Sequence, residues 1–305
     1  MELYNIGKAI YHYREKHKLS QAQVCEGICT EMTLSRIETG ERECDFFLMS
    51  ILMERLGKTV SRFEFFLNDE DYDYYILREN IEKAIEMGHP ELAKQYVEEY
   101  RKDVSITYVV QEQFLLYYDA LMMKKQNKSK QDIVDCLYHA INLTRPDFME
   151  KEKGLRLYSR LEIKIIYELL YYESFAYDVM EGLFHFVDEM YDEEEKGELL
   201  LPFLYHYAKK YEKEEKWFEL EKVTSRGIGY IQAGRTYKYL VEFQFMNMLA
   251  EYELNRNAVI WDEKRNELVK KCNAIYYMSM TIEDMKMMKS AEQFCKEQLG
   301  CQVTT

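Results

Sequence analysis

Residues 19–42 constrain the fold more than any other stretch, because they hold the start and stop signals of two short helices in direct succession. Ser20 followed by Gln23 is a capping box, in which the serine hydroxyl and the glutamine side chain each accept a backbone hydrogen bond from the other residue. Val24 and Ile28 then give the first helix an apolar stripe. We therefore expect a short helix that starts after Ser20 and buries one face.

The second helix of the pair is delimited as clearly as the first. Thr30 is a favourable N-cap residue, and Gly40 can adopt the left-handed conformation that ends a helix. Leu34 and Ile37 share one face and are expected to pack inward. The side chains left on the outer face are Glu31, Met32, Ser35 and Arg36. The pattern predicts two helices joined by a tight turn, with this outer face open to contacts.

A resemblance to a known family rests on two runs, Leu19-Ser20-Gln21 and Leu34-Ser35-Arg36-Ile37-Glu38-Thr39-Gly40. They resemble the helix-turn-helix of the Cro and lambda-repressor (Xre) class, over about residues 5–67. The resemblance implies a five-helix DNA-binding domain. The remaining helices are expected at residues 5–18, between Asp45 and Gly57, and from a second capping box at Ser61 and Glu64 through Leu67.

The same resemblance implies an ion pair within this domain. The family pairs an arginine of its first helix with the glutamate before the terminal glycine, and the matching residues are Arg14 and Glu38. The alternative is that Glu38 is an ordinary solvated helix residue.

The second helix of such a pair presents its N-terminal residues to base edges in the major groove, while the first helix contacts the backbone. The residues predicted to contact DNA are Gln21, Glu31, Met32, Thr33, Ser35, Arg36 and Arg42. Arg36 can pair with guanine or with phosphate, and Glu31 can accept from cytosine or repel other bases. The turn is one residue shorter than in the lambda-repressor pattern, which leaves the register of base contacts open.

Charge is distributed unevenly along the chain. The 305 residues carry a formal net charge of −14, but residues 1–67 contain nine Lys and Arg against ten Asp and Glu, a difference of −1. The remainder therefore carries −13. Local positive charge matters more for phosphate contact than the total, so the acidic balance does not exclude DNA binding and should weaken its non-specific part.

Composition narrows the class of protein further. Only 3 Pro and 12 Gly predict long helices with few turns. No apolar run approaches the roughly 20 residues of a membrane span, no secretion signal is evident, and the seven cysteines are an odd number. These features predict a reduced, cytoplasmic protein with no membrane partner.

Residues 68–75 are acidic and are interpreted as a short linker, and residues 76–305 form a series of amphipathic helices paired into hairpins. Some hairpins resemble tetratricopeptide repeats, with Ala84, Gly88 and Ala93 at small positions of that motif. The predicted fold is all-α, a helix-turn-helix domain followed by an α-solenoid of tetratricopeptide-like hairpins. An irregular helical bundle is the alternative.

This architecture resembles the Rgg and PlcR-type peptide-responsive regulators of Gram-positive bacteria, whose repeat domain dimerises and binds a short peptide. The candidate peptide-binding residues are Gln113, Tyr117, Tyr205, Arg235, Gln244 and Asn247. Paired tyrosines recur on these helices, either as packing between helices or as the lining of a groove. Met285, Met288, Phe294 and Leu299 of the last helix are expected to cap the array or to meet a second subunit.

The chain lacks the sequence signatures of catalysis. It contains no Gly-rich phosphate loop, no His-Glu-x-x-His and no Gly-x-Ser-x-Gly. Cys25, Cys29 and Cys44 are a possible metal cluster, but zinc sites use four ligands and a closer pair spacing, so we interpret them as packing residues. We expect no enzymatic activity, no cofactor and no metal.

Two functions remain open from the sequence. The first is a homodimeric, sequence-specific transcriptional regulator that binds double-stranded DNA and senses a short peptide. The second is a helical-repeat scaffold or antitoxin-like regulator that binds a partner protein, with the helix-turn-helix localising it to DNA.

Overall fold

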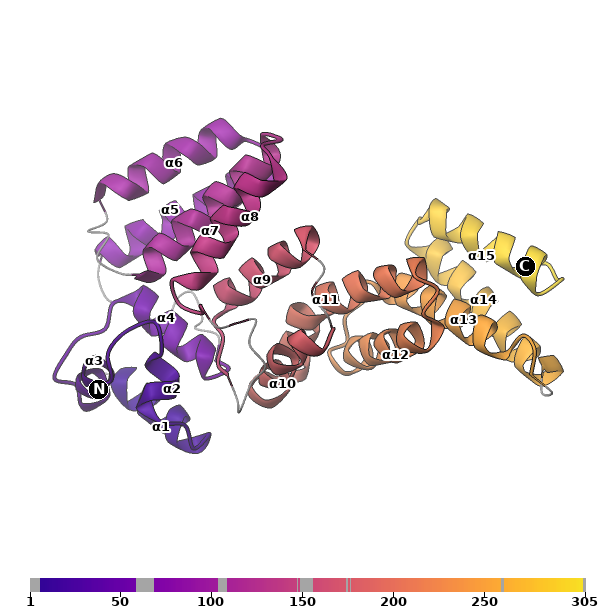
Figure 1. The fold of residues 1–305 in the computed structure, drawn as a ribbon, viewed down its shortest axis with the longest axis horizontal. Helices are drawn as coiled ribbons and strands as arrows, with labels where there is room; N and C mark the ends of the chain where they lie inside the picture. The colour runs from indigo at the N-terminus through magenta and orange to yellow at the C-terminus, as the bar shows by residue number, and fades with distance from the viewer. Residues whose placement is uncertain are drawn as a thin grey trace. The chain divides into compact units, whose positions relative to one another are not determined.

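The computed structural model describes residues 6–58, 69–103, 109–146, 148, 156–173, 175, 177–258 and 261–303. Within these ranges the regular structure is helical, with no β-strand (Figure 1). The chain forms two compact units, Met1–Met190 (unit 1) and Tyr191–Thr305 (unit 2). The predicted all-α fold is confirmed for the described part of the chain.

Unit 1 begins with four helices that we call the head (residues 6–58). They are α1 (Ile6–Lys16), α2 (Gln21–Cys25), α3 (Glu31–Thr39) and α4 (Phe46–Arg55). The capping box of Ser20 and Gln23 is present, Thr30 caps α3, and Gly40 ends α3 with a φ of 79°. Ile10, Val24 and Leu34 are fully buried between these helices, as the sequence pattern predicts. The predicted fifth helix, with Ser61 and Glu64, lies outside the described residues.

The rest of unit 1 is a set of longer helices. They are α5 (Asp69–Glu86), α6 (Pro90–Asp103), α7 (Val109–Lys125), α8 (Lys130–Asn142), α9 (Arg160–Tyr172), the 3₁₀ helix η1 (Tyr177–Met180) and α10 (Glu181–Met190). The pairs α5–α6 and α7–α8 pack as hairpins, and α9 packs on α8. Ala84 and Ala93 are buried in the first hairpin, which agrees with their assignment to small positions.

Most of the residues interpreted as a linker, 68–75, lie in a helix, because α5 starts at Asp69. Acidic residues are favourable in the first turn of a helix, where they face the positive end of its dipole. Tyr74 and Tyr75 then anchor this turn, since their rings lie 6.0 Å from Tyr100 and from Phe46 respectively. The acidic composition therefore marks the start of a helix rather than a connection.

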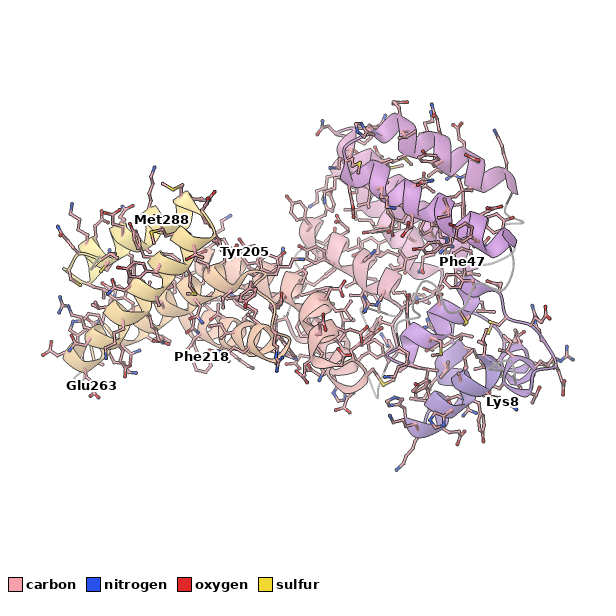
Figure 2. The ribbon with its side chains drawn as sticks, turned by 180° about the vertical axis from the view of Figure 1, so that it is seen from behind. Lys8, Phe47, Tyr205, Phe218, Glu263 and Met288 are labelled. Carbon is pink, nitrogen blue, oxygen red and sulfur yellow. The ribbon has the colours of Figure 1, made fainter. Side chains whose placement is uncertain are left out.

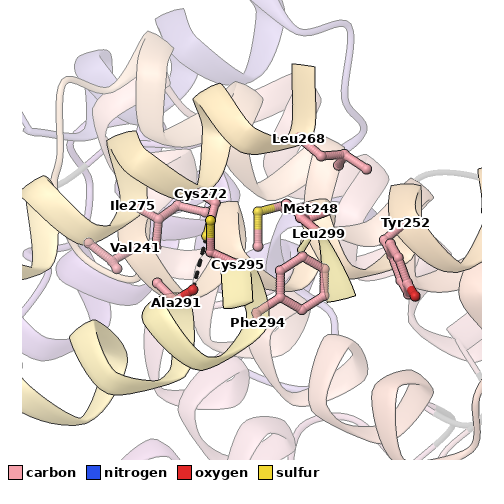
Figure 3. Packing of buried hydrophobic residues seen from close by; sticks show 10 residues of the cluster. All are labelled: Val241, Met248, Tyr252, Leu268, Cys272, Ile275, Ala291, Phe294, Cys295 and Leu299. Carbon is pink, nitrogen blue, oxygen red and sulfur yellow. Dashed lines mark hydrogen bonds between the residues drawn. The ribbon is translucent and has the colours of Figure 1, made fainter. Parts of the chain in front are cut away.

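Unit 2 contains α11 (Glu193–Lys213), α12 (Trp217–Ala233), α13 (Leu240–Asn255), α14 (Trp261–Thr281) and α15 (Met285–Gln298), each packed on the next. Met248, Leu268 and Phe294 belong to a buried cluster between the last three helices (Figure 3). Phe294 and Leu299, which we considered for contact with a second subunit, lie inside this core, whereas Met285 is 60% exposed. A side chain of the last helix faces either the core of unit 2 or solvent. The apolar periodicity of that helix alone did not predict which of these side chains are buried.

The hairpin turns share one hydrogen-bonding pattern. Gly88, Asn127, Glu215 and Glu283 each have a positive φ and are each the second residue after the end of a helix. At each turn the next backbone N–H bonds to the carbonyl five residues earlier, as from Asp284 to Ser279 at 2.9 Å. This Schellman arrangement satisfies the last carbonyls of a helix and reverses the chain tightly. Repetition of this turn explains the series of hairpins in a chain with few glycines.

We expect Glu283→Gly to stabilise the protein by up to about 1 kcal/mol, because glycine removes the Cβ strain of the left-handed conformation at an exposed position. Glu292→Gly, at an exposed site inside α15, is the matched control and should cost about 1 kcal/mol. Urea unfolding of both variants checks the prediction. Equal destabilisation by the two substitutions would show that the φ of 59° at Glu283 carries no strain.

Candidate nucleic-acid interface

The outer face of α3 is available for contact. Glu31, Met32 and Arg36 are exposed, and Met32, a large apolar side chain, is 66% exposed. Thr33 and Ser35 are half-buried, with the Thr33 hydroxyl 3.0 Å from that of Thr30. These side chains occupy one face because Leu34 and Ile37 hold the other face in the core.

Several basic residues of the head, which come before and after α3 in the sequence, lie on the surface of the protein. Lys8, Lys16 and Lys18 of the first helix and its following turn are exposed, as is Arg42 after α3. Figure 2 shows Lys8 projecting from the head. Exposed cations of this kind can neutralise phosphates, whereas buried ones cannot.

Arg14 and Glu38 form the pair that the family resemblance implies. Arg14 Nε donates to Glu38 Oε1 at 2.7 Å, and Nη2 donates to Oε2 at 3.0 Å. The side chains are only 9% and 4% exposed. The hydrogen bond to Glu38 raises the pKa of Arg14 further above its ordinary value, against the opposing effect of burial. This two-point contact fixes α3 on α1.

The pair also holds the turn between α1 and α2. Arg14 Nη1 donates to the Leu19 carbonyl at 2.9 Å and to Glu15 at 2.7 Å. Gln21 Nε2 donates to Glu38 Oε2 at 2.7 Å, so Gln21 is engaged inside the head. Gln21 is predicted on the DNA face; its amide nitrogen lies on the ion pair while the residue stays half-buried, and its role toward DNA stays a prediction.

Several charged residues that the sequence interpretation did not single out dock the head on the other helices of unit 1. Arg55 is fully buried, and its Nη2 donates to Glu162 at 2.9 Å, while Nη1 donates to the carbonyls of Val24 and Glu26. Arg145 is buried as well and donates to Glu26 Oε2 at 2.6 Å. These contacts bridge 107 and 119 residues, and no local spacing signals them.

Close backbone approach accompanies the buried charges. A Cβ at Gly27 would lie 2.3 Å from the Thr144 carbonyl oxygen, and one at Gly57 would lie 1.9 Å from that of Met190. Both glycines also have positive φ, which favours glycine. Larger residues are therefore excluded both by this conformation and by the close contact of a Cβ. The docking therefore uses the residues that directly follow α2 and α4.

The three cysteines of the head are all at least half-buried, with Cys29 the most exposed of them. Cys25 and Cys44 are buried, and Cys25 Sγ lies 3.8 Å from the Ala22 carbonyl. Among the residues that the structure describes, no three His, Cys, Asp or Glu side chains are grouped so that they could hold a metal ion.

The six candidate peptide-binding residues fall in both units and have different environments. Gln113 is 1% exposed, and its amide nitrogen donates to Ala140 O and Thr144 Oγ1. Asn247 is also buried and donates to Thr224 Oγ1 at 2.9 Å. Both amide nitrogens are already used inside the protein, and the assignment of these two residues to a ligand stays a prediction. Amides at helical spacing look alike in sequence whether they face solvent or core.

The other four candidates divide by exposure. Tyr117 is buried, and burial raises the pKa of its hydroxyl. Tyr205 is half-buried and stacks on Tyr239 with ring centroids 4.7 Å apart. Arg235 is exposed and Gln244 is half-buried. Tyr205, Arg235 and Gln244 are the candidates that a ligand can reach at the surface of unit 2, and the assignment of the buried Tyr117 stays a prediction.

A family model described as a helix-turn-helix matches residues 10–63, which contain α2 and α3 with their turn. This part of the chain is a helix-turn-helix domain. No curated protein matches the chain in sequence. Among the described residues, none of the helices combines the length and the apolar character that crossing a membrane requires.

The chain is also similar to solved structures at low identity. One is ComR from S. thermophilus in complex with DNA and its signalling peptide ComS, at 18% identity and a TM-score of 0.45, over 97% of this chain and 100% of that chain. A second is PlcR from Bacillus thuringiensis in complex with the peptide PapR7 and DNA. Its sequence identity is 13% and its TM-score is 0.46, over 95% of this chain and 99% of that chain. A third is the SHP pheromone receptor Rgg2 from Streptococcus dysgalactiae. Its sequence identity is 11% and its TM-score is 0.43, over 96% of this chain and 99% of that chain.

The Arg14–Glu38 pair gives a stability prediction. Glu38→Ala leaves the buried guanidinium of Arg14 without its main partner and should cost about 3–5 kcal/mol. Glu15→Ala removes the exposed carboxylate from the same arginine and should cost less than about 1 kcal/mol. Denaturant unfolding of the full chain compares the two variants. Similar small losses for both would mean that the pair does not hold the head together.

Glu162 gives a prediction that depends on pH. Burial opposes its ionisation, but Arg55 and Arg145 outweigh burial and hold its pKa below the ordinary value of 4.5. A depressed pKa stabilises the fold above pH 4.5, and this contribution is lost as pH falls through the folded pKa. Glu162→Gln should cost about 3–5 kcal/mol at pH 7, and the difference from wild type should shrink in acid.

The matched control is Glu168→Gln on the same helix, whose partner Lys124 is 36% exposed. It should cost less than about 1 kcal/mol at pH 7. Unfolding at pH 7 and at pH 3 measures both effects. A Glu162→Gln loss that stays constant between these pH values would contradict the role assigned to the ionised carboxylate.

Proposed function

We propose that the protein is a sequence-specific DNA-binding transcriptional regulator. The observation that supports this most directly is the exposed outer face of α3 on a helix-turn-helix domain whose orientation is set by the buried Arg14–Glu38 pair. A helix held this firmly can present fixed side chains to the major groove.

In the proposed complex the first turns of α3 lie in the major groove. Glu31, Met32 and Ser35 face the bases, and Arg36 reads guanine or binds phosphate. Thr33 supports the start of α3, and Arg42 contacts the DNA backbone. Met32 supplies apolar contact, for example to a thymine methyl group.

We further propose that the protein acts as a homodimer and senses a short peptide. One α3 contacts few base pairs, and two heads about 34 Å apart would raise both affinity and selectivity. The helical hairpins beyond residue 69 provide the dimer contact and the peptide surface, with Tyr205, Arg235 and Gln244 as the exposed or half-buried candidates. A regulator of this kind works in the cytoplasm, and the proposal includes no enzymatic step.

Selection of bound duplexes from a random DNA library, with the full chain as bait, tests the proposal. We expect an enriched motif with two related half-sites one helical turn apart. Light scattering of the same protein should show a dimer. Recovery of only unrelated sequences, with affinity set by salt alone, would contradict sequence-specific regulation.

Arg36→Ala should weaken binding to the selected site by about 1–3 kcal/mol if the arginine reads a base, with relaxed preference at one position. If it binds phosphate, the loss should be uniform across sequences and the salt slope should fall by about 1. Arg256→Ala is the control, because Arg256 is exposed in unit 2 and pairs with Glu253. Gel-shift titration at fixed salt decides, and an Arg36→Ala affinity equal to that of Arg256→Ala would remove Arg36 from the interface.

A further inference from the structure

Two thiols meet at the C-terminal end of α15. Cys295 Sγ and Cys301 Sγ are 3.7 Å apart. Cys295 belongs to the buried cluster that Figure 3 shows, and Cys301 packs against the same cluster while remaining half-buried. One sulfur is therefore held in the core, and the other lies on the segment that follows the helix.

The backbone brings these residues together independently of their side chains. The Cys301 N–H donates to the Cys295 carbonyl at 3.2 Å. Gly300, with a φ of 64°, reverses the chain between them. Arg265 Nε donates to the Leu299 carbonyl at 2.8 Å and so holds the end of the helix in place. The approach of the two sulfurs is thus built into the way that α15 ends.

The nearby third thiol, Cys272, also hydrogen-bonds with the Cys295 side chain, so it competes with Cys301 for Cys295. Cys272 is fully buried, and its Sγ donates to the Ala291 carbonyl at 3.0 Å (Figure 3). Burial raises the pKa of Cys272 to about 12 and that of Cys295 to about 11, so both stay protonated at neutral pH. Cys301 is the most exposed of the three sulfurs and is the first that a small oxidant can reach.

We propose that Cys295 and Cys301 are a redox modification site that forms a reversible intrachain disulfide with a two-electron oxidant of the hydrogen peroxide class. The Cys301 thiolate attacks peroxide, which gives a sulfenic acid and hydroxide. Cys295 then attacks this sulfur, and its thiol proton leaves with the sulfenic hydroxyl as water. One disulfide bond forms, two thiols are oxidised and one peroxide is reduced. A dithiol reductant reverses the change.

The required movement is small. A disulfide brings its sulfurs to about 2.05 Å, so the present separation closes by less than 2 Å. Cys301 can supply this movement because it follows the last helix, whereas Cys295 is fixed in the core. The closed bond would tie residues 300–303 to α15 and restrict the unfolded chain, which should raise the melting temperature of the oxidised form.

Peptide mapping of the full chain tests the site, because trypsin separates the three thiols. Cleavage after Lys271, Lys286, Lys289 and Lys296 places Cys272, Cys295 and Cys301 in residues 272–286, 290–296 and 297–305. After hydrogen peroxide, alkylation and digestion, we expect peptide 290–296 linked to 297–305, with the loss of two hydrogen atoms. Dithiothreitol before alkylation should abolish the link and lower the melting temperature.

Two variants control the assignment. Cys301→Ser should leave Cys295 alkylated and remove the difference in melting temperature between oxidised and reduced protein. Cys136→Ala, at a half-buried cysteine of unit 1, should keep the link. A link through residues 272–286, or Cys301 recovered only as thiol or as sulfinic acid, would overturn the proposal. The readout is independent of DNA binding, so neither result depends on the function proposed above.

Discussion

The buried ion pair between Arg14 and Glu38 is the interaction on which the geometry of the head depends. Removing two charges from water is costly, and only a well-formed pair recovers that cost. The bidentate contact, with Leu19 O and Gln21 as further partners, meets this condition. An alternative orientation of α3 would leave these charges buried and unpaired. The pair therefore selects one orientation of α3, the helix proposed to face DNA, more than it adds net stability.

A second group of buried charges extends this constraint beyond the head. Arg55 and Arg145 lie between α2, α4 and the start of α9, and each has a carboxylate partner. Packed interfaces of this kind have discrete arrangements and do not deform continuously. A ligand on the helices of unit 1 would therefore act on the head only if it bound two such arrangements with unequal affinity.

The parts of the fold that sequence predicted are those set by local chemistry. Caps at Ser20 and Thr30 and the stop at Gly40 depend on residues within one turn, and Arg14–Glu38 followed from a family motif. The Arg55–Glu162 contact was missed because its partners are 107 residues apart. Gln113 was predicted to bind a ligand, because a glutamine that faces the core cannot be told in sequence from one that faces solvent. The roles of the α3 side chains toward DNA remain predictions.

The charge balance also changes once burial is known. Two of the basic residues of the head, Arg14 and Arg55, are neutralised inside the protein and cannot meet phosphates. The exposed cations Lys8, Lys16, Lys18, Arg36 and Arg42 remain for that role. Their attraction is screened beyond about 8 Å at physiological ionic strength, while the rest of the chain carries an excess of acid. Long-range attraction to DNA should then be weak, so in the proposed complex we expect affinity to come mainly from short-range contacts of α3, the contacts that would distinguish one sequence from another.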